Sequence, residues 1–165
     1  MFYGEAWLAE LLAVHQAHPD EVIAHRAHRI GMQDGKILPY TRWAPGAPPV
    51  ASYRTFPTGI SGVLYPPRMV QLLREAGDAF ARCAPMGDDI WLHAMAVRHG
   101  VRVRPVRDGR TTYRPLPGAL LRGLKFRNVL GGGNDVQITA TYTAEDLARM
   151  GQELEQNHEQ DPWTV

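Results

Sequence analysis

Prolines and glycines interrupt the apolar stretch between Tyr53 and Tyr65, and this restricts the chain to short structural elements. Pro57, Gly59 and Gly62 all fall inside that stretch, and Pro66-Pro67 closes it. Proline cannot donate a hydrogen bond to a neighbouring strand, and glycine weakens a strand interior, so both mark strand ends or bulges. The sequence therefore predicts a broken strand followed at once by a helix.

Apolar periodicity and turn residues predict the remaining elements. Helices are expected over 4–17, 68–81, 89–99 and 143–156, and strands over 22–30, 37–40 and 101–106. Asp34-Gly35 predicts a hairpin turn, 43–50 predicts a loop, and Thr143 begins a capping-box pattern. Gly131-Gly132-Gly133 is expected to end an amphipathic segment over 117–130. Alternating helices and strands predict an α/β architecture with a few strands, some of them parallel.

Length and composition fit one globular unit. The chain has 165 residues, 44% hydrophobic and 21% charged, which is enough for a sizeable core. We expect a main domain over 1–140 and a C-terminal helix with a polar tail over 141–165. The single Cys83 excludes an internal disulfide and fits a reducing compartment. No apolar run reaches the ~18–20 residues that span a bilayer, so we expect a cytoplasmic protein, with the inner face of the membrane left open as a location.

Positive charge is concentrated in one segment, although the net charge is only +1. Between Val101 and Arg127 seven arginines and one lysine stand against a single acid, Asp108. Such a segment is a solvated face or a contact for phosphate, a lipid headgroup or nucleic acid. Nucleic acid is disfavoured, because Tyr113 and Phe126 are too few aromatics for base stacking and no zinc-finger spacing occurs. Peripheral membrane contact through the amphipathic residues 120–127 stays open.

Two adjacent carboxylates, Asp88 and Asp89, stand at the expected start of the helix over 89–99. Neighbouring helical residues point about 100° apart, so both side chains cannot face one cleft. One is expected to cap the helix, and the other is free to face a ligand and remove a proton from a hydroxyl group. The alternative is that both are surface acids favoured by the helix dipole.

The segment 25–29 is a dense cationic cluster. Side chains alternate on a strand, so His25 and Arg29 share one face while Arg26 and His28 share the other. The histidines diverge, which argues against a two-histidine metal site. Phosphate contact by an arginine and a purely structural role both stay open.

The turn over 58–62 combines Thr58 with two glycines, Gly59 and Gly62. A glycine turn of this kind lets the backbone approach a ligand hydroxyl or phosphate. It is equally compatible with a bulge that bends a strand. The pattern alone does not choose between these interpretations.

Five segments in series resemble a group of bacterial glycosyltransferases of the GT-A fold, associated with capsule, lipopolysaccharide and related surface-glycan synthesis. They are AHRAHRI, GKILPY, FPTGISGVLYPP, APMGDDIWLHAMAV and GGGNDVQI, and the resemblance covers residues 2–138. It implies a partial GT-A fold, the C-terminal acceptor-side portion without the Rossmann-like nucleotide-binding half. The implied activity is transfer of a hexose from a nucleotide sugar to a glycan or glycolipid acceptor.

The resemblance also implies roles for individual residues. Asp89, with Asp88 beside it, holds the position of the catalytic base. The residues implied or expected to bind substrate are Thr58, Gly59 and Gly62 in the sugar cleft, Asn134, Asp135 and Gln137 in a late polar segment, and Arg26 at a phosphate.

One part of the family pattern is missing. The family holds a divalent metal, Mn²⁺ or Mg²⁺, with an acidic D-x-D motif, and no D-x-D occurs in this sequence. The family thus implies a metal, but we assign it no ligand here. A partner chain or self-association is expected to cover the surface left by the missing half. The alternative function is a non-catalytic carbohydrate- or phosphate-binding module, or a pseudoenzyme, that keeps the acceptor cleft.

Overall fold

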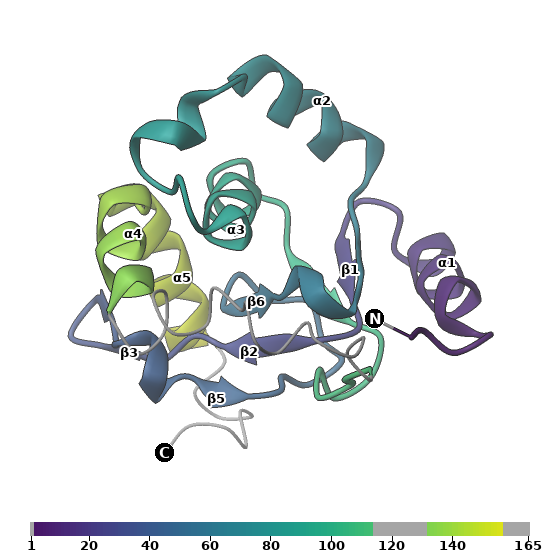
Figure 1. Ribbon diagram of the computed structural model, residues 1–165. Coiled ribbons are helices and arrows are strands. Elements are labelled where there is room, and N and C mark those ends of the chain that lie inside the picture. The colour runs from purple at the N-terminus through teal and green to yellow at the C-terminus, as the bar shows by residue number, and fades with distance from the viewer. Residues whose placement is uncertain (1, 114–131, 157–165) are drawn as a thin grey trace.

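The computed structural model describes residues 2–113 and 132–156 and has a mixed α/β architecture there (Figure 1). The helices are α1 (Trp7–Ala17), α2 (Pro67–Ala76), α3 (Asp88–Arg98), α4 (Gly133–Thr141) and α5 (Ala144–Gln156). The strands are β1 (Val22–Ala24), β2 (Ala27–Arg29), β3 (Met32–Gln33), β4 (Lys36–Ile37), β5 (Ala44–Pro45), β6 (Thr55–Pro57), β7 (Val63–Leu64) and β8 (Val103–Pro105). Short 3-10 turns lie at Tyr40–Arg42, Gly59–Ser61 and Ala79–Arg82. The expected α/β class is confirmed.

The strands of the described residues form three small sheets. In the first, β1 pairs antiparallel with β7 and parallel with β8. In the second, β2 lies between β5 and β6 and is antiparallel to both. The third is the hairpin β3–β4, whose turn residues Asp34 and Gly35 have φ angles of 51° and 72°. The expectation of a few strands, some of them parallel, is therefore confirmed.

The single strand expected over 22–30 is wrong, because the chain passes from one sheet to the next at His25 and Arg26. The His25 N–H donates to the carbonyl of Gly62, and the Thr58 N–H donates to the carbonyl of Arg26. These bonds satisfy the backbone at the crossing without a continuous ladder. They also hold the crossing against the turn that follows β6.

One helix prediction also differs from the structure. The helix expected over 68–81 stops at Ala76, because Gly77 follows with a φ of 57° and the chain bends there. The segment over 117–130 that the three glycines are expected to end lies outside the described residues, and α4 begins at Gly133.

The cap expected for the last helix is confirmed. The Asp146 N–H donates to Oγ1 of Thr143 at 3.3 Å, and the Thr143 N–H donates back to Oδ2 of Asp146 at 3.0 Å. This reciprocal arrangement satisfies two N–H groups that a helix start otherwise leaves unpaired.

The central helix α3 has core on two sides, between the arch of α2 and the strands β2 and β6 (Figure 1). One buried cluster joins α3 to β6 and α5 and includes Phe56, Ile90 and Met150. The other joins α3 to α2 and includes Met69 and Met95. Burying an apolar side chain of this size contributes about 1.5–3 kcal/mol. The first residues of α3 therefore stand on a firmly packed element.

None of the described helices is long and apolar enough to span a lipid bilayer. The amphipathic segment expected over 117–130, which includes the candidate membrane-contact residues 120–127, lies outside the residues that the structure describes.

Candidate functional site

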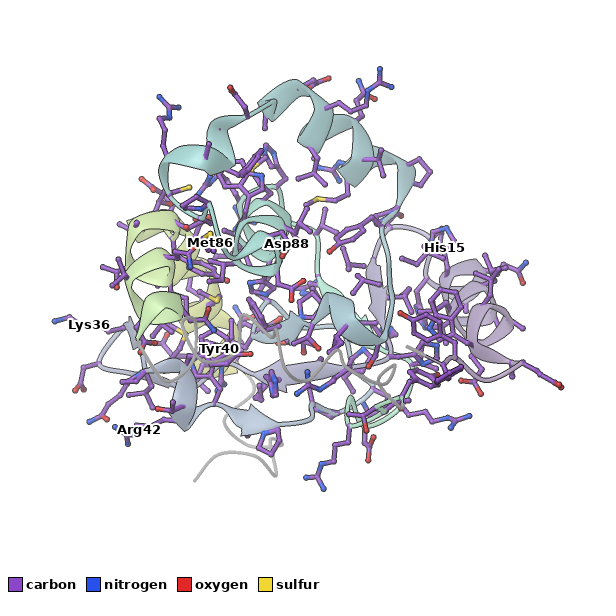
Figure 2. The ribbon with its side chains drawn as sticks, viewed as in Figure 1. His15, Lys36, Tyr40, Arg42, Met86 and Asp88 are labelled. Carbon is purple, nitrogen blue, oxygen red and sulfur yellow. The ribbon has the colours of Figure 1, made fainter. Side chains whose placement is uncertain are left out.

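Asp89 faces a turn that lies thirty residues earlier in the sequence. The backbone N–H of Gly59 donates to Oδ1 of Asp89 at 3.0 Å. Asp89 is half-buried, whereas its neighbour Asp88 is exposed at the start of α3 (Figure 2). The two carboxylates therefore have different surroundings, as expected. The capping role expected for one of them is wrong, because no side chain caps this helix start.

The carboxylate of Asp89 leaves little room for a side chain at position 59. A Cβ built on it would lie 3.0 Å from Oδ1 of Asp89, which is closer than ordinary van der Waals contact. Any larger residue would push the carboxylate away from the N–H group. The glycine turn is expected from the sequence to let the backbone approach a ligand. At Gly59 the backbone instead approaches the carboxylate of Asp89.

Arg26 and Thr58 lie beside this pair. Nη1 of Arg26 donates to Oγ1 of Thr58 at 3.3 Å, and the Thr58 N–H donates to the Arg26 carbonyl at 2.9 Å. The guanidinium is close enough to lower the pKa of both Asp89 and His28. The structure therefore brings together four of the predicted site residues, Arg26, Thr58, Gly59 and Asp89.

The surroundings of Asp89 raise its proton affinity. Burial first, and then repulsion from Asp88, raise the pKa of Asp89 from 3.8 to about 6. The hydrogen bond from Gly59 and the charge of Arg26 act in the opposite direction. A carboxyl group with a pKa near 6 is ionised at neutral pH and still basic enough to accept a proton from a substrate.

His28 has the opposite character. Burial, followed by the nearby positive charge of Arg26, lowers the pKa of His28 to about 4. Its ring meets the edge of Tyr40 with centroids 5.8 Å apart. The charge of Arg26 reaches His28, and His28 is a neutral packing group at pH 7.

Two tyrosines at the site are not predicted by the sequence analysis. Burial raises the pKa of Tyr65, and the charges of Asp89 and Asp88 raise it further. Burial also raises the pKa of Tyr40, where the charges of Arg26 and Asp89 act in opposite directions. Tyr40 ends GKILPY and Tyr65 lies within FPTGISGVLYPP, both quoted for the resemblance, so a motif position next to proline was the available signal.

Two polar side chains of the late segment 134–137 bind backbone N–H groups of neighbouring loops. On α4, Oε1 of Gln137 accepts from the Met86 N–H at 2.8 Å, and Oδ1 of Asp135 accepts from the Tyr40 N–H at 2.7 Å. Asn134 lies partly buried in the first turn of this helix. The amide oxygen of Gln137 is therefore engaged with the loop that leads into α3.

Gly62 is packed against protein instead of lining an open cleft. It is buried, with a φ of 99°, and a Cβ there would lie 2.5 Å from the indole ring of Trp7. The glycine is required by this close approach and by its backbone angle.

A hollow of about 680 Å³ adjoins the site through Tyr65. Its lining residues are Tyr65, Pro67, Val70, Gln71, Arg74 and Glu75, all but the first on α2. The side chains of Gln71 and Glu75 are joined by a hydrogen bond of 2.9 Å. The amide and guanidinium N–H groups can donate to hydroxyl groups, and the amide and carboxylate oxygens can accept from them.

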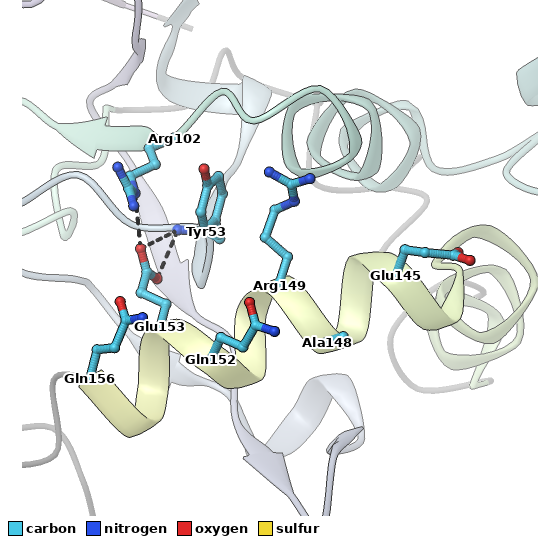
Figure 3. Close-up of a pocket in the computed structure, with 8 residues that line it drawn as sticks. All are labelled: Tyr53, Arg102, Glu145, Ala148, Arg149, Gln152, Glu153 and Gln156. Atoms are coloured by element: carbon cyan, nitrogen blue, oxygen red, sulfur yellow. Dashed lines mark hydrogen bonds and ion pairs between the residues drawn. The ribbon is translucent and has the colours of Figure 1, made fainter.

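A second hollow, of about 430 Å³, lies between α5, Tyr53 and Arg102 (Figure 3). Of its two carboxylates, Glu145 and Glu153, Glu153 is only 6% exposed and is already engaged. Glu153 accepts from Oγ of Ser52, from the Tyr53 N–H and from Nε of Arg102. These bonds dock α5 on the loop before β6, so we assign the cluster a structural role.

Metal binding has no ligand set in the part of the chain that the structure describes. No three His, Cys, Asp or Glu side chains lie close enough there to share an ion. Asp88 and Asp89 differ in exposure, and one oxygen of Asp89 is held by Gly59. No ligand for the metal that the resemblance implies is therefore assigned among the described residues.

Comparison with known proteins adds no relative. No protein family, curated protein or solved structure matches the chain.

Proposed function

We propose that this chain is the acceptor-side part of a GT-A glycosyltransferase, with Asp89 as its catalytic base. One observation supports the proposal most: Asp89 is a half-buried carboxylate, anchored through one oxygen, with a pKa of about 6. A general base is most effective when its pKa lies near the working pH. Because Gly59 holds Oδ1, we assign proton acceptance to Oδ2.

In the proposed reaction, an acceptor hydroxyl gives its proton to Asp89. The hydroxyl oxygen bonds to the anomeric carbon of the donor hexose while the bond from that carbon to the diphosphate oxygen breaks. The nucleoside diphosphate leaves with the electron pair, and solvent later takes the proton from Asp89. Attack opposite the leaving group inverts the configuration at the anomeric carbon.

Arg26 is proposed to contact the diphosphate of the donor. Its bond to Thr58 uses one guanidinium donor, and a guanidinium group has five. Charge-assisted hydrogen bonds to phosphate are roughly twice as strong as neutral ones. The hollow that Tyr65 borders offers room for an acceptor, and the charge of Asp89 reaches Tyr65 and raises its pKa.

The test is nucleoside diphosphate release from a panel of uridine and guanosine diphosphate hexoses, with and without simple glycosides as acceptors. With the nucleotide-binding half supplied, by a partner chain or in a longer protein, we expect release with at least one donor, and loss of that release in Asp89→Asn. Asp78→Asn, an exposed acid before the turn Ala79–Arg82, is the matched control. Release that survives Asp89→Asn unchanged would rule out Asp89 as the base.

A non-catalytic module that binds a glycan or phosphate at the same residues is the alternative. The engagement of Oδ1 of Asp89 by Gly59 favours it, because an oxygen bonded to the backbone has a structural role that an asparagine oxygen can also fill. Under this alternative no donor is turned over, and glycan binding measured by calorimetry is unaffected by Asp89→Asn.

A further inference from the structure

The indole of Trp7 is fixed to the turn that holds Asp89. Nε1 of Trp7, at the start of α1, donates to the carbonyl of Ser61 at 2.8 Å. A buried tryptophan N–H needs such a partner, and here the partner is the last residue of the turn Gly59–Ser61. The bond joins positions 54 residues apart in the sequence.

Tyr3 supports the same contact. Its ring stacks on Trp7, with centroids 4.6 Å apart and an interplanar angle of 26°. Its hydroxyl donates to the carbonyl of Ile60 at 3.4 Å. Two aromatic side chains of the N-terminal segment therefore bond consecutive carbonyls of one turn.

Shape complementarity adds to these hydrogen bonds. Gly62 lies against the indole so closely that a Cβ would come within 2.5–2.8 Å of three ring atoms of Trp7. The carbonyl of Trp7 also lies 2.9 Å from the ring nitrogen Nε2 of His25. The backbone N–H of His25 donates to the Gly62 carbonyl. The ring is therefore enclosed by the crossing between β1 and β2 and by the turn.

The turn transmits this anchoring to Gly59. The Gly62 N–H donates to the Gly59 carbonyl at 3.0 Å, which closes a single 3-10 turn. A turn of three residues has few ways to move at one end while the other end is held. The orientation of the Gly59 N–H, and hence its bond to Asp89, depends on where Trp7 holds Ser61 and Gly62.

We propose that Trp7 is a positioning residue for Asp89, because its indole fixes the Gly59–Ser61 turn that donates to Oδ1. Trp7 contacts neither Asp89 nor a substrate. Its catalytic importance rests on the function proposed above, but the positioning itself is a property of the folded chain.

The test uses the Gly59 amide as the reporter, followed by ¹⁵N–¹H NMR from about pH 4 to about pH 8. In the wild type its resonance shifts as Asp89 ionises. Asp89→Asn removes that titration and so identifies its source. The charged or titratable groups around Asp89 are Asp88, Arg26, Tyr40 and Tyr65, and of these only Asp88 is a carboxyl group.

Trp7→Leu is expected to lose most of the Gly59 titration while the protein stays folded. Trp7→Phe removes only the N–H donor and keeps a ring against Gly62, so it gives a partial loss and serves if the leucine variant does not fold. Leu11→Ala, at a buried position of the same helix, loosens α1 without removing either bond to the turn and is expected to keep the titration.

A full Gly59 titration in both folded Trp7 variants would overturn the proposal, and so would a titration that survives Asp89→Asn. Equal losses in Leu11→Ala and Trp7→Phe would also overturn it, because they would reflect general loosening of α1. None of these outcomes needs a substrate. The absence of transferase activity would count against the proposed function and leave this result standing.

Discussion

The Gly59 N–H donates to Oδ1 of Asp89 at 3.0 Å, and a Cβ on Gly59 would lie only 3.0 Å from the same oxygen. This contact joins the turn after β6 to the first residues of α3. It keeps one carboxylate oxygen occupied and in a fixed direction. The site follows from that relationship, because Arg26, Thr58 and the two tyrosines surround the same carboxylate.

Arg26→Gln is expected to weaken use of the nucleotide sugar. Loss of a charge-assisted contact to phosphate costs about 1.5–3 kcal/mol, which corresponds to a rise in KM of about 10-fold to 150-fold. The kinetic pKa assigned to Asp89 also rises, because the charge of Arg26 lowers it in the wild type.

Steady-state kinetics over a range of pH measures both effects. Arg42→Gln, at an exposed arginine that ends the Tyr40–Arg42 turn, is the control and is expected to behave as the wild type. Equal KM values for Arg26→Gln and Arg42→Gln would show that Arg26 does not contact the donor.

Asp89→Asn is expected to stabilise the fold at neutral and alkaline pH. The folded state raises the pKa of Asp89 from 3.8 to about 6, so it binds a proton more tightly than the unfolded state does. The wild type therefore loses stability as pH rises from about 4 to about 6, by at most about 3 kcal/mol. Asparagine keeps an oxygen for Gly59 and removes the repulsion from Asp88.

Urea unfolding at about pH 4 and about pH 8 measures this difference. The two proteins are expected to be similar in stability at the lower pH, with the variant more stable at the higher pH. A difference that does not depend on pH would mean that Asp89 titrates as an ordinary surface acid.

Much of the fold follows from local sequence signals. The Asp34-Gly35 hairpin, the start of α3 and the Thr143 cap are each determined by a few neighbouring residues. The division of 22–30 between two sheets is not local, because it depends on hydrogen bonds that His25 and Arg26 make with Gly62 and Thr58. A periodicity argument has no access to such pairings.

Residue type and position identify some of the site residues, whereas others depend on contacts between distant parts of the sequence. Asp89 and Gly59 stand out by type and position, and the structure joins them. In the sequence Trp7 is an ordinary apolar residue of a helix, because its role depends on the carbonyl of Ser61, 54 residues away. Gly62 reads as part of a ligand turn, but its partner is the Trp7 ring.

Gly62→Ala is expected to destabilise the fold far more than Gly35→Ala. Both glycines have positive φ angles, 99° and 72°, but a Cβ at Gly35 meets nothing within 4 Å whereas one at Gly62 meets Trp7. Strain at Gly35 costs about 1–2 kcal/mol. The clash at Gly62 adds about 1–3 kcal/mol, as overpacking does in cores. Thermal or urea unfolding of both variants checks this, and equal losses would contradict the close packing against Trp7.

Glu153→Gln is expected to loosen the docking of α5. The buried carboxylate accepts from Ser52, Tyr53 and Arg102, and an amide places a donor where one of these donors lies. The loss of stability is about 2–3 kcal/mol. Glu155→Gln, exposed on the same helix, changes stability by about 0.5 kcal/mol or less. Hydrogen exchange of α5 localises the effect, and equal values for the two variants would contradict the docking role.

The most direct test of the account is the pKa of Asp89, measured by ¹³C NMR of its carboxyl carbon in the full chain. The account predicts a value of about 6, with a lower value in Asp88→Asn because the neighbouring charge is removed. A value near the ordinary 3.8 in the wild type, unchanged in Asp88→Asn, would show an unperturbed surface carboxylate and contradict its role as a base.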